Sequence, residues 1–113
     1  MNEERYILKK VSRDQVTSEL DRLWPELSDP DSAISQKAKE LQINIEPLRG
    51  LRREEVIDIQ RRESGLDTDA IVMAFVAHGI VEVAKAAWIH LILPRIKTDL
   101  GDDSIKPDEP GKK

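Results

Sequence analysis

The sequence predicts a mainly α-helical fold, a small bundle of three or four helices around a long apolar helix at about residues 68–93. Two observations lead to this prediction. The segment 70–93 (AIVMAFVAHGIVEVAKAAWIHLIL) is the only long apolar stretch, and few of its side chains can carry a charge. In the N-terminal half, apolar residues recur at helical spacing, about 100° per residue. The other segments allow at most a minor two-stranded β pairing.

The first elements are a β-prone lead-in at 1–11 and, after it, a single helical domain at 12–100. A helix is predicted to start after Ser12, a good N-cap that forms a capping box with Gln15. Its apolar stripe consists of Val16, Leu20, Leu23, Trp24 and Leu27. Pro25 should end or kink this helix.

A second helix is predicted with Asp29 as its N-cap, Pro30 at its first position and an end near Gln42. It would contribute a short apolar face to the same core as the first helix.

The next segment is ambiguous. Val and Ile residues in 54–61 suit a strand, while the Arg and Glu residues around them suit a helix, so the choice stays open. We favour a strand slightly, because residues 55–60 could pair with residues 6–11.

Five arginines gather in this part of the chain: Arg49, Arg52, Arg53, Arg61 and Arg62. Because Glu54, Glu55 and Asp58 are interleaved with them, the pattern predicts a solvated charged face rather than a docking site.

The long apolar helix would be capped by Asp67 or Thr68 and bent or ended by Pro94. The remaining segment, 101–113, contains two prolines, two glycines and mixed charges, which is typical of a disordered tail.

A helix that is apolar nearly all round must be covered by its own protein, by copies of itself or by lipid. Small residues follow one of its faces and would let a second helix approach closely. This predicted interaction face consists of Ala70, Ala74, Ala77, Val81, Ala84 and Trp88. The two shorter helices supply few large apolar residues to cover it, so we expect a homo-oligomer or a protein partner.

A narrow polar strip, His78, Glu82 and Lys85, interrupts the apolar surface at spacings of four and three residues. It could be a proton-sensitive or metal-binding cluster, because His changes charge near neutral pH. A metal site would need a further ligand, for which the sequence offers no candidate. The favoured interpretation is a solvent-facing seam, without a bound metal.

Composition narrows the function. The chain has 113 residues and a net charge of −4, which argues against broad binding to nucleic acid or anionic membranes. It has no cysteine, which rules out disulfides and thiolate metal sites. The N-terminus MNEERYILKK lacks the apolar core of a secretion signal, so we expect a cytoplasmic protein.

No motif of a nucleophilic, metal-dependent or phosphate-binding enzyme occurs, so we expect neither catalytic residues nor a cofactor. Residues 34–51 loosely match the start of a helix-turn-helix. However, Pro47 and Gly50 fall inside the segment that would be the recognition helix, so DNA binding is only a minor alternative.

The C-terminal half has a distinctive layout. A β-prone run from Ile57 meets Gly65-Leu66-Asp67, and then comes the apolar segment with Trp88. The sequences Leu93-Pro94-Arg95-Ile96 and Gly101-Asp102-Asp103 follow. This layout resembles small accessory proteins encoded beside proteases or other effectors in bacterial conflict and immunity systems. The resemblance implies an adaptor, a protease target or a membrane-damaging effector.

The sequence therefore predicts a non-enzymatic protein–protein interaction or adaptor module that self-associates through helix 68–93. The alternative is a latent membrane-active effector whose N-terminal half restrains that helix until it is released. Acidic residues before the helix and the bases Arg95 and Lys97 after it would favour a cytoplasmic C-terminus on insertion.

Overall fold

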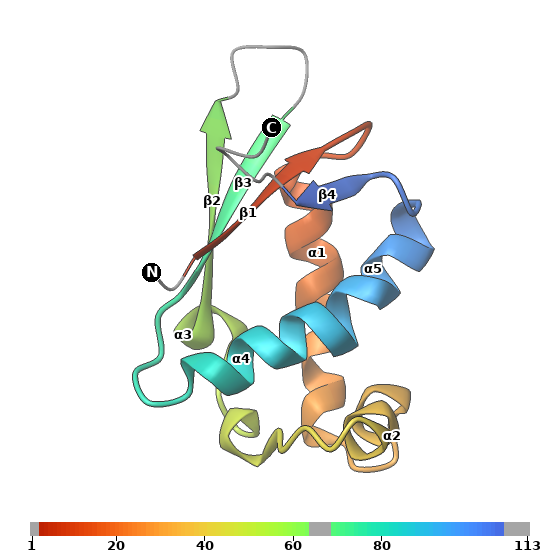
Figure 1. The fold of residues 1–113 in the computed structure, drawn as a ribbon, viewed down its shortest axis with the longest axis vertical. Coiled ribbons are helices and arrows are strands. Elements are labelled where there is room, and N and C mark those ends of the chain that lie inside the picture. The colour runs from red at the N-terminus through yellow and green to blue at the C-terminus, as the bar shows by residue number, and fades with distance from the viewer. Residues whose placement is uncertain (1–2, 64–68, 108–113) are drawn as a thin grey trace.

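A computed structural model describes residues 3–63 and 69–107 of the chain. It shows a mixed α/β fold in which a four-stranded antiparallel sheet carries the helices on one side (Figure 1). The predicted mainly α-helical bundle is therefore wrong. Its central error concerns residues 68–93, which do not form one long helix.

In chain order the elements are β1 (Glu3–Leu8), α1 (Arg13–Leu23), the 3₁₀ turn η1 (Trp24–Ser28), α2 (Ala33–Glu40), the 3₁₀ turn η2 (Glu46–Leu48), α3 (Arg53–Val56), β2 (Ile57–Glu63), β3 (Asp69–Phe75), α4 (Val81–Ala87), the π-turn η3 (Trp88–Ile92), α5 (Leu93–Leu100) and β4 (Ile105–Pro107).

The strand order in the sheet is β2-β3-β1-β4. Strand β1 pairs with β3 from Glu3 opposite Ala74 to Leu8 opposite Asp69, and its other edge pairs with β4. The predicted pairing of residues 6–11 with residues 55–60 is wrong, because β3 lies between β1 and β2. The strand-or-helix ambiguity over 54–61 has a mixed answer, since the short helix α3 runs directly into β2.

The two faces of the sheet differ in polarity. Asp58, Gln60 and Lys106 on the outer face are exposed. The inner face is buried under the helices and consists of Tyr6, Leu8, Ile57, Ile59, Ile71, Met73, Phe75 and Ile105. Strands β1 and β2 thus alternate between core and solvent, as expected for strands covered on one side.

Strand β3 explains the failure of the long-helix prediction. Its outer-face residues Ala70 and Val72 are only 6% and 8% exposed, while Ile71 and Met73 fill the core on the other face. A strand buried on both faces is as continuously apolar as a buried helix, so periodicity does not separate the two. Gly79 then turns the chain at a φ of +84°, which glycine adopts without strain, and helix begins only at α4.

From α4 onwards the chain stays helical to Leu100, past Pro94. Proline has no N–H, and its ring clashes with the carbonyl four residues earlier, here that of His90. The helix accommodates Pro94 through the π-turn, in which the Leu93 N–H donates to the carbonyl of Trp88, five residues earlier. The helix therefore continues past Pro94, but its hydrogen bonding changes at this point from the α to the π pattern.

The first helix is confirmed in detail. The Ser12 side chain accepts from the Gln15 N–H while the Gln15 side chain accepts from the Ser12 N–H, and α1 gives way to η1 at Pro25. The second helix starts later than predicted. Its N-cap is Ser32, because the Asp29 carboxylate instead accepts from the Asp31 N–H and shapes the preceding turn.

Three other predictions concern the helix caps and the two ends of the chain. The predicted caps at Asp67 and Thr68 lie outside the described residues. Part of the predicted disordered tail is ordered, because β4 pairs with β1 and Ile105 is fully buried. The predicted lead-in at 1–11 contains β1, one of the two inner strands of the sheet, so the domain extends beyond 12–100.

The helices are joined to the sheet by one buried aromatic pair. The indole Nε1 of Trp88 donates to the hydroxyl of Tyr6 at 2.8 Å, and the rings meet edge to face with centroids 5.9 Å apart. Burial raises the pKa of Tyr6 to about 12, against the opposite effect of the Trp88 hydrogen bond. This pair fixes the π-turn over the centre of the sheet.

Candidate functional site: the Trp24 groove

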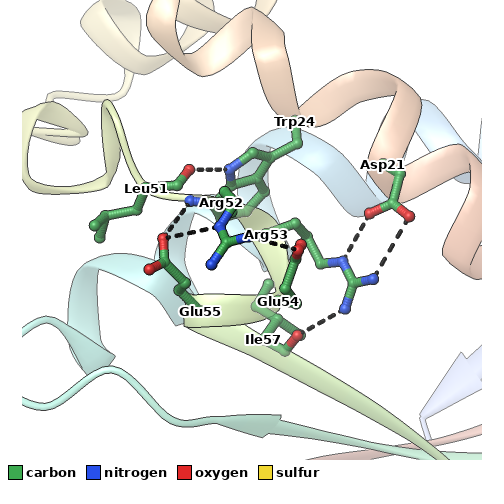
Figure 2. A network of polar contacts seen from close by, with 8 residues as sticks. All are labelled: Asp21, Trp24, Leu51, Arg52, Arg53, Glu54, Glu55 and Ile57. Atoms are coloured by element: carbon green, nitrogen blue, oxygen red, sulfur yellow. Dashed lines mark hydrogen bonds and ion pairs between the residues drawn. The ribbon is translucent and has the colours of Figure 1, made fainter.

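A groove of about 430 Å³ lies where the end of α1 approaches the segment leading into α3. One wall carries Asp21, Trp24, Pro25 and Ser28, and the opposite wall is the segment 50–54. We call this hollow the Trp24 groove. Its two walls are far apart in the sequence and are joined by the hydrogen bond from Trp24 to the Leu51 carbonyl and by the ion pair of Asp21 with Arg53 (Figure 2).

Trp24 forms the apolar base of the groove. It lies at the junction of α1 and η1, where Pro25 converts the helix into a 3₁₀ turn. Its indole Nε1 donates to the carbonyl of Leu51 at 2.8 Å, which satisfies the one polar atom of the ring and holds the two walls together. The indole is therefore fixed in place rather than free to rotate.

Arg53 forms a second link between the same two walls. Its Nε lies 2.7 Å from Oδ1 of Asp21, and its Nη1 donates to the carbonyl of Ile57 at 2.9 Å (Figure 2). Only 15% of the Arg53 side chain is exposed. A planar guanidinium can bridge a carboxylate and a carbonyl in this way, which an ammonium group cannot do with the same geometry.

Arg52 behaves differently from its neighbour. Its side chain is 73% exposed, and its contacts to Glu54 and Glu55 are ion pairs at 3.8 Å, beyond hydrogen-bond distance. Pairs of this kind are weak in water. The Arg52 guanidinium is therefore an exposed and weakly paired charge at the rim of the groove, next to the fixed indole and the fixed Arg53.

Arg53 also protects a sheet edge. The Val76 N–H donates to the Val56 carbonyl, and backbone groups alternate in direction along a strand, so the carbonyls of Ile57 and Ile59 point away from β3. Arg53 donates to the first, and Arg13 donates to the second from Nε and Nη2. Of the carbonyls that β2 turns to its open edge, those of Ile57 and Ile59 are thereby bonded to arginine, which discourages pairing with another strand.

The predicted interaction face does not exist as one surface. Its members are spread over the sheet, the following loop and the helix: Ala70 and Ala74 in β3, Ala77 in the loop, and Val81, Ala84 and Trp88 in α4 and the π-turn. Ala84 and Trp88 are 1% and 0% exposed, because they pack in the core. The small residues permit close packing of the helix within its own domain.

The predicted polar strip is also divided. His78 lies in the exposed turn before α4, while Glu82 and Lys85 lie on the helix. Lys85 forms an ion pair with Glu4 of β1 at 3.6 Å, so it ties the helix to the sheet. Across the described residues, 3–63 and 69–107, no cluster of His, Asp and Glu could hold a metal ion.

No helix within the described residues is both long and apolar enough to cross a bilayer. The membrane-insertion alternative depended on a single helix at 68–93, and that helix is replaced by β3, a turn and α4. The helix-turn-helix alternative would need a recognition helix after α2, and within residues 34–51 only the short 3₁₀ turn η2 follows α2.

Comparisons with protein-family models, curated proteins and solved structures find no match to this chain.

Sequence reasoning missed the groove. It assigned Trp24 to the apolar stripe of α1, which is correct, and it assigned Arg52 and Arg53 together to a solvated face, which holds only for Arg52. The available signal was a tryptophan directly before a proline, which places a large ring where a helix ends.

Proposed function

We propose that this protein is a non-enzymatic adaptor that binds a short segment of a partner protein in the Trp24 groove. The observation that carries the proposal is the combination of a fixed indole and a fixed Arg53 beside a loosely held Arg52. Tryptophan and arginine are the residues that most often dominate the energy of protein interfaces. Preorganisation lowers the entropy cost of binding, so the bonds that fix the groove favour this use.

The groove also indicates the chemistry of the partner segment. Trp24, Pro25 and Leu51 supply an apolar base, which suits one apolar anchor side chain. Arg52 can exchange its weak ion pairs for a carboxylate of the partner. We therefore expect an apolar residue flanked by Asp or Glu. Of the two carboxylates that line the groove, Asp21 is engaged by Arg53, and Glu54 lies 3.8 Å from Arg52. The proposed place of action is the cytoplasm, as the cysteine-free sequence suggests.

A selection experiment tests the proposal. A library of random peptides displayed on phage is panned against the purified protein, and enriched peptides are synthesised and their dissociation constants measured. We expect peptides with an apolar residue beside an acidic one. Arg52→Glu should weaken their binding at least about tenfold, because an attraction becomes a repulsion.

The matched control is Lys106→Glu, which makes the same charge change on exposed strand β4. It should leave binding unchanged. If no peptide is enriched, or if the enriched peptides bind wild type and Arg52→Glu equally, the proposed function is wrong.

A further inference from the structure

A second hollow of about 270 Å³ lies between α2 on one side and the π-turn with the start of α5 on the other. Its base is apolar and includes Ile34 of α2 and Leu91 of the π-turn. Its rim carries Lys37, His90 and Arg95, and Pro94 completes one side. We call it the π-turn cleft. Its geometry is independent of the Trp24 groove, because the lining residues are different.

One side of the cleft is formed by the π-turn and the start of α5. Because Leu93 donates to the Trp88 carbonyl, the helix contains one extra residue in that turn. His90 and Leu91 lie four positions before Pro94 and Arg95, so the four residues share one face of the helix and line the same cleft. π-turns inside α-helices often occur at functional sites.

The charges at the rim favour one kind of ligand. The side chains that line the cleft include two permanent cations, Lys37 and Arg95, and no carboxylate, in a chain whose net charge is −4. The acids nearest to these cations hold them weakly. Lys37 is 4.0 Å from Glu40, Arg95 is 3.6 Å from Glu26, and both cations remain substantially exposed. Such pairs contribute little and can be exchanged for a ligand carboxylate.

We propose that the π-turn cleft binds a small carboxylic acid with a compact apolar body. The apolar part would lie against Ile34 and Leu91, and the carboxylate would pair with Lys37 and Arg95. The volume of the cleft is near the lower end for ligand pockets, about 300 to 1,000 Å³, so the ligand is a medium-chain or single-ring acid rather than a long-chain lipid. The inference goes beyond the proposed adaptor function and does not depend on it.

The test uses octanoate as the probe and ¹⁵N-labelled full-length protein. Octanoate should shift the backbone amide signals around Ile34 and Leu91 in a saturable manner, without shifting the indole signal of Trp24 in the separate groove. Lys37→Gln and Arg95→Gln should each weaken binding by up to about fivefold, the range of an exposed ion pair. The controls are Lys39→Gln and Lys97→Gln, which lie two positions further along the same helices and outside the lining, and both should leave binding unchanged.

1-Octanol, which has the same chain without the charge, separates the two contributions. If octanol binds as tightly as octanoate, the carboxylate has no role and the proposal is overturned. It is also overturned if millimolar octanoate causes no saturable shift, or if the control variants weaken binding as much as the rim variants.

Discussion

Replacement of Arg53 tests the network that joins the walls of the Trp24 groove. Arg53→Met keeps much of the aliphatic side chain and removes the guanidinium, with its bonds to Asp21 and to the Ile57 carbonyl. Asp21 is 50% exposed, so the ion pair contributes at most about 1 kcal/mol. The bond to the Ile57 carbonyl is partly buried and has a charged donor, so it adds about 1.5 kcal/mol, the low end for such a bond.

The free energy of unfolding should therefore fall by about 2 kcal/mol. For a domain of this size, 1 kcal/mol corresponds to about 4 °C in melting temperature, so the expected decrease is about 8 °C. Thermal unfolding followed by circular dichroism, with urea unfolding as a second measurement, gives both values.

The matched control is the neighbouring Arg52→Met, which removes the same group from a side chain that is 73% exposed. It should lower the melting temperature by less than about 2 °C. A double-mutant cycle with Asp21→Asn separates the ion pair from the bond to Ile57. If Arg53→Met destabilises no more than Arg52→Met, the reasoning about the network is refuted.

Three further substitutions test other parts of the fold. Ser12→Ala should lower the free energy of unfolding by about 1 kcal/mol through loss of the capping box. The control Ser18→Ala, on the exposed face of the same helix, should not destabilise the protein. Equal effects of the two substitutions in urea unfolding would contradict this prediction. Gly79→Ala should cost about 1 to 2 kcal/mol from backbone strain, because a φ of +84° is unfavourable for alanine. No atom lies within 4 Å of the new Cβ, so a steric clash should add nothing to this cost. An unchanged urea midpoint would contradict the described turn. The pKa of Tyr6 is about 12 in the fold and about 10 in the unfolded chain, so the free energy of unfolding of the wild type should fall by up to about 2.7 kcal/mol as pH rises from 10 to 12. Tyr6→Phe should lack this part of the fall. Parallel stability curves of the two proteins over that range would contradict the burial of the hydroxyl.

The sequence was informative where signals are local. Ser12 and Gln15 identify the start of α1 because a capping box involves residues three positions apart, and Pro25 identifies its end because proline acts on its own turn. The open question over 54–61 was also well founded, since a helix and a strand meet there.

The sequence misled where the answer depends on tertiary burial. Residues 70–75 are continuously apolar, with Ile71 and Met73 in the core and Ala70 and Val72 also buried on the outer face, and this pattern matches a buried helix equally well. The error then spread to the predicted interaction face, which assumed that Ala70 and Trp88 lie on one helix. They belong to a strand and to the π-turn.

The Trp24 groove could not be read from the sequence for a related reason. Trp24 meets the carbonyl of a residue 27 positions away, and Asp21 meets a side chain 32 positions away. Local spacing carries no information on such contacts, so Arg53 could not be distinguished from Arg52. Arg53 is bonded to the Asp21 carboxylate and the Ile57 carbonyl, whereas the Arg52 guanidinium forms ion pairs at 3.8 Å.

The central claim, that a partner segment occupies the Trp24 groove, is tested most directly by the two indole N–H signals of the ¹⁵N-labelled protein. A peptide from the phage selection is titrated, and the signals of Trp24 and of the buried Trp88 are followed in the same spectra. The account predicts a saturable shift of the Trp24 signal with the Trp88 signal unmoved. Saturable binding that leaves the Trp24 signal in place would contradict it.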